Sequence, residues 1–213
     1  MNESIVGVIT GDIVDSQKIE PENYDNMLYT LERTFTELKE RRDVTFEIYR
    51  GDAFQAIFSN PVDAVKSAVI IRLALKTAIS SFDVRQNVGI GGVTSRRSDI
   101  KTSTGEAFTL SGKGLDNIRS SYIAVTTNNK QFQSKIGLLT KFLDAHLSGL
   151  TLIQSETLLC YLTSEDKSHE FIASSLSKTR SNTTKLLNAG HYQLIDEYSS
   201  YFDSCFTESF NHV

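Results

Sequence analysis

Two aspartates, each directly after a glycine at the end of an apolar run, have the residue type and spacing for metal chemistry. Asp12 follows the apolar segment 5–9, and Asp52 lies forty positions later in a short turn between segments 44–49 and 53–58. A glycine-containing turn of this kind joins two antiparallel strands. If the strand that leads to Asp12 pairs with this hairpin, both carboxylates meet at one edge of a sheet. Two such carboxylates form a hard oxygen site suited to Mg²⁺ or Mn²⁺, and through the metal to a triphosphate.

Composition and charge limit the classes of protein that this chain can represent. Its 213 residues, 39% of them hydrophobic, suffice for one ordinary core and a small second unit. The net charge of −4 gives the whole molecule no general attraction for nucleic acid. Cys160 and Cys205 are interpreted as reduced thiols rather than a disulfide. Without a signal-peptide pattern or an apolar run of roughly 18 residues, we expect a cytoplasmic protein with no membrane partner.

The periodicity of apolar residues predicts the elements that must position these aspartates. Strands are expected at residues 4–14, 44–49, 53–58, 84–93 and 122–125, and helices at 22–42, from 60 onward and at 105–118. The order is β-α-β-β-α-β, followed by a further helix and strand. This is the split βαβ pattern, in which the first strand is central and ends beside the hairpin turn. We therefore predict an α+β, ferredoxin-like domain over residues 1–126.

After residue 127 the strand patterns end, and residues 127–213 are predicted to form an all-helical domain. Within it, residues 168–190 read as two short helices on either side of a polar turn, which is the spacing of a helix-turn-helix, winged or not. The expected DNA contacts are Lys178, Arg180 and Lys185 for phosphates, with Asn182 and Thr183 for base edges. The alternative is a three-helix packing or dimerisation unit that never meets DNA.

Several cations are candidates for phosphate contacts, because guanidinium and ammonium groups match phosphate oxygens. They are Arg50, Arg96, Arg97, Lys101 and Lys113. A solvated loop is the simpler interpretation for Arg96 and Arg97. Lys113 is the strongest candidate, because it stands between two glycines, where a ligand can approach the backbone closely.

With these motifs in hand, the first 125 residues or so resemble the palm-like catalytic domain of class III nucleotidyl cyclases. Asp12 and Ile13 resemble the first metal motif of that family, which implies that the Asp12 carboxylate and the Ile13 backbone carbonyl hold metal. Gly51 and Asp52 resemble its Gly-Asp hairpin, which implies that Asp52 is the second ligand. Class III sites commonly form between two subunits, so the resemblance also implies a homodimer.

A third segment, residues 105–113, resembles the start of the helix that carries the transition-state residues of that family. In place of the family's Asn and Arg this chain has Thr109 and Lys113, which the resemblance makes the catalytic candidates. A lysine can offset phosphate charge but cannot form the bidentate fork of arginine. At the base-reading positions the chain has Ile48 and Thr102, so the choice of base stays open. The resemblance implies nucleotide contacts at Arg50, Gly51, Gly105 and Gly112.

The whole chain is similar to the SatD family, which pairs such a domain with a helix-turn-helix. The hypothesis is a metal-dependent nucleotide-binding protein, with nucleotidyl cyclase-like turnover as its enzymatic form, coupled to DNA-binding helices. One alternative is a catalytically inactive, nucleotide-sensing transcription regulator. The other is a pure interaction module with a vestigial palm site.

Overall fold

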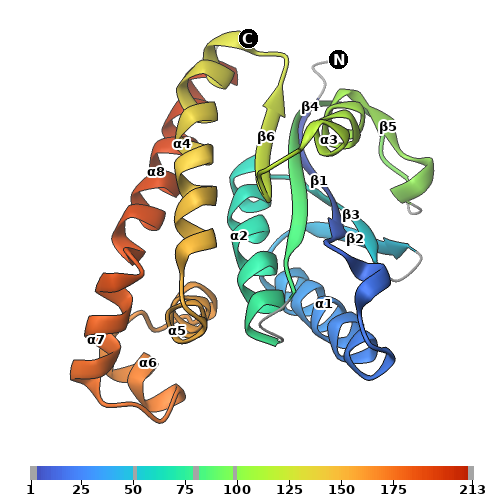
Figure 1. Cartoon of the computed structure of the whole chain (residues 1–213). Coiled ribbons are helices and arrows are strands. Elements are labelled where there is room, and N and C mark those ends of the chain that lie inside the picture. Colours follow the sequence, from blue (N-terminus) through green and yellow to red (C-terminus); the bar gives the residue numbers. More distant parts are fainter. Residues whose placement is uncertain (1–3, 50–51, 79–81, 98–99, 211–213) are drawn as a thin grey trace.

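The computed structural model describes residues 4–49, 52–78, 82–97 and 100–210, and it has an α+β fold (Figure 1). The strands are β1 (Ile5–Ile13), β2 (Val44–Tyr49), β3 (Ala53–Phe58), β4 (Val84–Ser95), β5 (Thr104–Gly105) and β6 (Ile123–Thr127). The α-helices are α1 (Pro21–Arg41), α2 (Pro61–Ala78), α3 (Glu106–Asn117), α4 (Lys130–Gly149), α5 (Leu152–Thr163), α6 (His169–Ser175), α7 (Arg180–Ala189) and α8 (Tyr192–Phe210). The predicted α+β class is confirmed.

The sheet places β1 at its centre. The strand order is β2-β3-β1-β4-β5, with β1 antiparallel to both β3 and β4, and β6 pairs in parallel with β4. The first elements follow one another as β-α-β-β-α-β, in the order that the sequence predicts. As a result, the end of β1 lies beside the β2–β3 hairpin.

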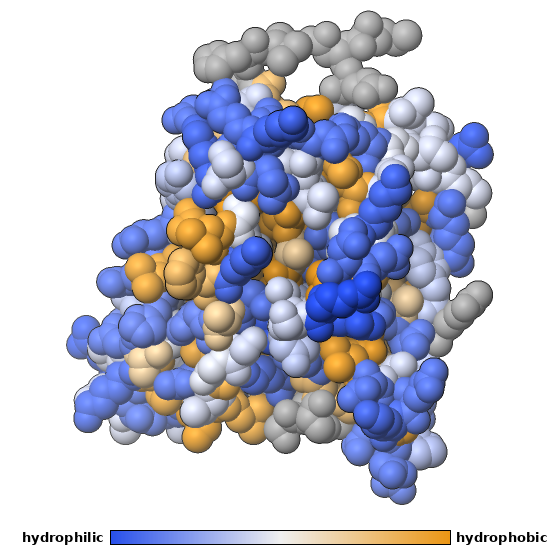
Figure 2. Space-filling model, turned by 45° about the horizontal axis from the view of Figure 1, so that its top comes forward, coloured by the Kyte–Doolittle hydropathy of each residue, from blue (hydrophilic) through white to orange (hydrophobic). Residues whose placement is uncertain are grey.

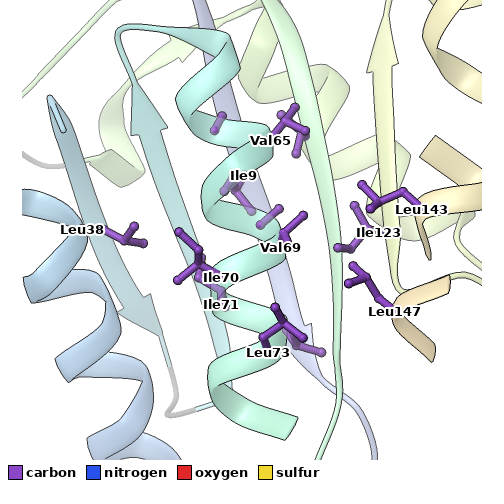
Figure 3. Close-up of a cluster of buried hydrophobic side chains, with 14 of the residues drawn as sticks. Ile9, Leu38, Val65, Val69, Ile70, Ile71, Leu73, Ile123, Leu143 and Leu147 are labelled. Atoms are coloured by element: carbon purple, nitrogen blue, oxygen red, sulfur yellow. The ribbon is translucent and has the colours of Figure 1, made fainter. Parts of the chain in front are cut away.

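One face of the sheet is covered by α1 and α2, and α2 is buried on nearly all sides. Ile9 of β1 packs against α2 on the sheet side. Figure 3 shows the apolar side chains of α2 between Leu38 of α1 on one side and Leu143 and Leu147 of α4 on the other. A helix that is apolar all round is typical of a buried position. Here the cause is a second layer of helices: α5 and α8 pack against α2 from the side away from the sheet.

The opposite face of the sheet is covered by α3. Gly89 of β4 allows this helix to approach closely, because a Cβ at residue 89 would lie 2.3 Å from the carbonyl oxygen of Ala107 and 2.4 Å from the backbone nitrogen of Ser111. A small apolar cluster that includes Val6, Val8 and Ala107 fills this contact. The α3 side of the sheet is therefore the more thinly covered one.

Arg72 of α2 links the sheet to the helical half of the chain, which consists of α4 to α8. It is 1% exposed; its Nε and Nη2 donate to Asp83 at 2.8 Å, and its Nη1 donates to Asp144 of α4 at 2.8 Å. Asp144 also accepts the backbone N–H groups of Tyr122 and Ile123 at the start of β6. Because one apolar core runs from the sheet through α2 to α4 and α8, the predicted boundary at 126/127 crosses no gap in packing.

The part of the chain described after β6 forms helices only, so no β-hairpin wing occurs within it. Residues 176–179 separate α6 from α7, and the Thr179 hydroxyl caps α7 by accepting the backbone N–H of Asn182. Both α6 and α7 pack on α5. None of the described helices combines the length and the apolar character that a bilayer span requires.

Candidate metal and nucleotide site

Backbone pairing brings the two aspartates to the same edge of the sheet. Asp12 lies opposite Ala53 in the β1–β3 register, and the Ile13 N–H donates to the Asp52 carbonyl oxygen at 2.8 Å. Asp52 therefore directly precedes Ala53, the strand residue that pairs with Asp12. The Ile13 side chain is 3% exposed and belongs to the core, so a contribution of Ile13 to the site comes from its backbone.

Arg85 of β4 is a member of this site that the sequence motifs did not reveal. It pairs with Asp12 in the β1–β4 register, and its Nη2 and Nε bind the two Asp12 carboxylate oxygens at 2.5 Å and 3.1 Å. The hydrogen bond to Asp12 raises the pKa of the Arg85 guanidinium above its ordinary value. The sequence signal that could have revealed this residue is an arginine near the start of a strand whose other residues are almost all buried.

Asp52 has a different partner. The Ser16 hydroxyl donates to its Oδ2 at 2.8 Å, from the short 3₁₀ turn Ser16–Lys18 that follows β1. Asp15 stands just before this turn in a left-handed conformation, with φ of 54°, and forms an exposed ion pair with Lys18. The edge of the sheet thus gathers three carboxylates, Asp12, Asp15 and Asp52, and two ion-paired cations, Lys18 and Arg85.

This donor set fits a nucleotide-dependent divalent ion better than a dedicated metal cage. The described residues contain no group of three His, Cys, Asp or Glu side chains that could hold a metal ion. Mg²⁺ in nucleotide sites usually keeps several waters and takes one or two carboxylates together with substrate phosphates. Asp12 and Asp52 match that pattern, provided that Arg85 releases the Asp12 oxygens. Arg85 can do so, because its side chain is 42% exposed.

A line of polar side chains extends from the aspartates across the α3 face of the sheet. Gln55 of β3 donates to the Thr10 hydroxyl at 3.1 Å, and Thr10 shares a 2.8 Å hydrogen bond with Ser111 of α3. The Tyr49 hydroxyl donates to Gln55 at 3.2 Å. This chain of contacts fixes the positions of β1, the hairpin and α3 relative to one another.

A hollow of about 560 Å³ opens beside the hairpin. It is lined by Ile48, Tyr49, Ala53 and Lys101. The Lys101 ammonium lies 4.7 Å from the centre of the Tyr49 ring and pairs with Glu47. An aromatic face and an ammonium group beside the aspartate edge could receive a flat, anionic ligand.

The other predicted residues of this site make no hydrogen bond or ion pair with the aspartates in the described part of the chain, or lie outside that part. Thr109 and Lys113 are exposed on α3 and take no part in the aspartate cluster. Gly112 has open space where a Cβ would lie, whereas a Cβ at Gly105, with φ of 157°, would meet β4 at 2.7 Å. Gly105 therefore has a packing role. Arg50 and Gly51 lie outside the described residues.

Two further cations in loops have clear positions. Arg96 donates to the Ser59 hydroxyl at 2.8 Å and pairs with Asp43, beyond the far end of the hairpin strands from Asp52. The Arg97 backbone N–H donates to the Ser103 hydroxyl at 2.9 Å. Neither residue joins the aspartate edge.

The residues predicted to contact DNA divide into buried, paired and exposed members. Thr183 has no exposed surface, so its hydroxyl cannot reach a base edge in this conformation. Lys178 pairs with Glu156 of α5 at 2.8 Å and is 19% exposed, while Arg180 lies 3.9 Å from Glu170 and is 72% exposed. Asn182 and Lys185 are exposed on α7. The outer face of α7 thus presents Arg180, Asn182 and Lys185 to solvent.

No protein-family model and no curated protein matches this sequence. Similar solved structures include the adenylyl cyclase CyaB from P. aeruginosa, with 17% identity, a TM-score of 0.44 and coverage of 57% of this chain and 76% of that one. The guanylyl cyclase Cya2 has 16% identity and a TM-score of 0.42, over 57% of this chain and 74% of its own. The catalytic core of a rhodopsin-guanylyl cyclase with converted specificity, in complex with ATPαS, has 16% identity and a TM-score of 0.41, over 58% and 78%.

Proposed function

We propose that this chain is a metal-dependent nucleotide-binding protein with a ferredoxin-like, palm-type first domain whose site lies at the Asp12–Asp52 edge of the sheet. The observation that supports this most is the 2.8 Å hydrogen bond from the Ile13 N–H to the Asp52 carbonyl oxygen, because it places the two aspartates side by side. Asp12, the Ile13 carbonyl and Asp52 would hold Mg²⁺ or Mn²⁺. When bound, the ion offsets and aligns the charges of a triphosphate.

Arg85 has two roles in this proposal. Without nucleotide, it neutralises Asp12 through two hydrogen bonds. With nucleotide, Asp12 turns to the metal and the guanidinium binds phosphate oxygens, for which its planar fork is suited. Lys113 takes no part in the aspartate cluster, but it is exposed on α3, the helix that contacts β1 through Ser111, and in this proposal its ammonium group meets the phosphates of the bound nucleotide.

The hollow beside the hairpin is the place for the base. Tyr49 offers a ring face for stacking, and Ile48 offers an apolar wall. Neither side chain has the hydrogen-bonding pattern that would distinguish adenine from guanine. We therefore propose broad selectivity among bases, with most of the binding free energy supplied by the phosphates and the metal.

The helical half is the proposed reader of DNA. Residues 168–190 form two helices around a four-residue connection, 176–179, and α7 presents Arg180, Asn182 and Lys185 outward. The packing of α5 and α8 against α2 provides a route by which nucleotide binding at the sheet could change the position of α7. In this proposal nucleotide occupancy alters DNA affinity.

Nucleotidyl cyclase-like turnover is the second candidate function, favoured by the aspartate pair itself. In that case divalent ions held by Asp12, the Ile13 carbonyl and Asp52 would activate a ribose 3′-hydroxyl and stabilise the departing pyrophosphate. Thr109 and Lys113, which lack a bidentate fork, favour binding without rapid chemistry.

The decisive experiment measures binding of each of the four ribonucleoside triphosphates by calorimetry, with Mn²⁺ and with a chelator. Metal-dependent binding that falls at least about tenfold in Asp12→Asn and in Asp52→Asn supports the proposal. Asp203→Asn, an exposed carboxylate on α8, is the matched control and should bind as the wild type does. Equal binding by all three variants, or no binding with any triphosphate, would overturn the proposal. Analysis of the same samples for cyclic product and pyrophosphate decides between binding and turnover.

A further inference from the structure

A hollowed apolar face lies between α4 and α8, on the side of the molecule away from the sheet. The two helices run antiparallel: Phe132 packs against Phe202 and Phe210, and near the other end the His146 Nε2 donates a hydrogen bond to the Gly190 carbonyl oxygen. Between them is a cavity of about 400 Å³, lined by Leu139, Phe142, Leu143, His146, Leu194, Ile195, Glu197, Tyr198 and Tyr201. We call these residues, together with the exposed Leu138, the α4–α8 face.

Several large apolar side chains of the α4–α8 face are exposed to solvent. Phe142 is 65% exposed, Leu138 62%, Leu194 58% and Tyr201 45%. Figure 2 shows hydrophobic surface gathered among hydrophilic residues on the side of the molecule where α4 and α8 lie in Figure 1. A contiguous apolar patch with a polar rim is typical of an interaction site.

The charges on the two helices are opposite in sign. α4 carries Lys130, Lys135 and Lys141, and its one acidic residue, Asp144, is buried against Arg72. α8 contains no lysine or arginine, and its acidic residues are Asp196, Glu197, Asp203 and Glu208. Within the chain Lys135 pairs with Glu208 at 2.7 Å, so the two helices already show this attraction at one end.

We propose that the α4–α8 face binds a second copy of this chain about a twofold axis, with α4 of each copy against α8 of the other. A twofold interface must be self-complementary, and this face carries both a protruding side chain, Phe142, and a cavity beside it. The basic helix of one copy then meets the acidic helix of the other, twice. The product is a four-helix arrangement with an apolar centre and a charged rim.

The size of the face is sufficient for a stable pair. α4 has 20 residues and α8 has 19, so each is about 30 Å long, and two adjacent helices present a face about 20 Å wide. Such a face has roughly 600 Å² in projection, which reaches the lower end of the roughly 600–1,000 Å² that a standard interface buries on each partner. The α4–α8 face is also remote from Asp12 and Asp52, so this pairing does not complete the nucleotide site with a second copy.

Sedimentation velocity of the full chain, over a roughly hundredfold range of micromolar concentration, tests the proposal. We expect dimers that weaken as salt is raised, and dissociation constants at least about tenfold larger for Phe142→Glu and for Leu194→Glu. Tyr29→Glu is the matched control, because Tyr29 is 61% exposed on α1 and lies away from this face. A monomeric wild-type chain would overturn the proposal. Dimers that persist in both Phe142→Glu and Leu194→Glu would also overturn it, because the copies would then pair through another surface, such as α3.

A pair of charge-reversed chains gives a second test that does not touch the apolar residues. One chain carries Lys130→Glu and Lys141→Glu, which makes both helices acidic. The other carries Glu197→Lys and Asp203→Lys, which places two lysines on α8 and removes its net negative charge. All four positions are exposed, so folding should be unaffected, as a thermal melt will verify. Each chain alone should be largely monomeric, and the mixture should form heterodimers. A mixture that stays monomeric while the wild type is dimeric would overturn the proposed arrangement.

Discussion

Arg85 binds both carboxylate oxygens of Asp12 across the β1–β4 pair, with Nη2–Oδ2 and Nε–Oδ1 distances of 2.5 Å and 3.1 Å. A divalent ion at Asp12 needs the same oxygen lone pairs. The guanidinium and the metal therefore compete for one carboxylate, and a nucleotide can resolve the competition by giving Arg85 phosphate oxygens in exchange. This makes metal affinity and nucleotide affinity dependent on each other at this site.

The first prediction concerns this competition. Arg85→Ala should increase the affinity of the nucleotide-free chain for Mn²⁺ by up to about fivefold, because a half-exposed ion pair contributes ~1 kcal/mol or less. The same variant should bind triphosphate more weakly, because a phosphate contact is lost. Electron paramagnetic resonance of free Mn²⁺ measures the first effect, and calorimetry the second.

Arg96→Ala is the control for that experiment, since Arg96 pairs with Asp43 away from the aspartate edge. It should leave both affinities unchanged. If Arg85→Ala and Arg96→Ala behave alike, the guanidinium of Arg85 does not govern access to Asp12.

The second prediction compares two glycines. Gly89→Ala should lower the free energy of unfolding by about 1–3 kcal/mol, because the new Cβ would lie 2.3 Å from the Ala107 carbonyl oxygen and push α3 away from β4. Gly112→Ala should raise it by about 0.5–1 kcal/mol, because nothing lies within 4 Å of its Cβ position and alanine favours the helix. Urea unfolding measures both. Equal effects of the two substitutions would contradict the close approach of α3 to the sheet.

The sequence revealed the parts of the fold that depend on local patterns and missed contacts between distant residues. The apolar run before Asp12, the hairpin at Asp52 and the apolar periodicity of the helices are local signals, and the strands and helices of the structure agree with them. Arg85 and Arg72 were not recognisable in that way, because their partners, Asp12 and Asp144, lie 73 and 72 positions away. Only the strand register and the packing of α4 bring these pairs together.

Thr183 illustrates a different limit. It stands next to Asn182 in a polar segment, and the sequence alone predicts a base-edge contact for both residues. Neighbouring residues on a helix point about 100° apart, so one of them can face solvent while the next faces the core. The packing of α7 on α5 decides that Asn182 is exposed and Thr183 is buried.

The third prediction concerns the buried ion pairs of Arg72. Arg72→Met should lower the free energy of unfolding by about 3–5 kcal/mol at neutral pH, because Asp144 is left buried without its counter-charge. Urea unfolding should show this loss. Lys66→Met, at an exposed position on the same helix, is the control and should change stability by less than about 0.5 kcal/mol.

The pH dependence of this loss provides its own check. Burial raises the pKa of Asp144 above its ordinary value, and Arg72 opposes that shift. Removing Arg72 raises the pKa further, so the folded variant retains a proton on Asp144 over a range in which the unfolded chain has lost it. Stability then falls as pH rises through the folded-state pKa. The cost of Arg72→Met should therefore grow as pH rises above the ordinary pKa of an aspartate, and a cost independent of pH would contradict this account.

The fourth prediction separates the residues of α7 by their function on DNA. Lys185→Ala should weaken binding to a random-sequence duplex of about 30 base pairs and lower the slope of log affinity against log salt by about one, because one phosphate contact is lost. Asn182→Ala should leave that binding nearly unchanged but reduce the preference for a selected sequence, since a base-edge contact is lost. Lys39→Ala, which removes an exposed lysine on α1, is the matched control. Fluorescence anisotropy at several salt concentrations, with and without triphosphate and Mn²⁺, measures all three variants. If Lys185→Ala and Lys39→Ala reduce the salt slope equally, or if the wild type binds no duplex at low salt, α7 is not a DNA-reading helix and the helical half serves the association of chains instead.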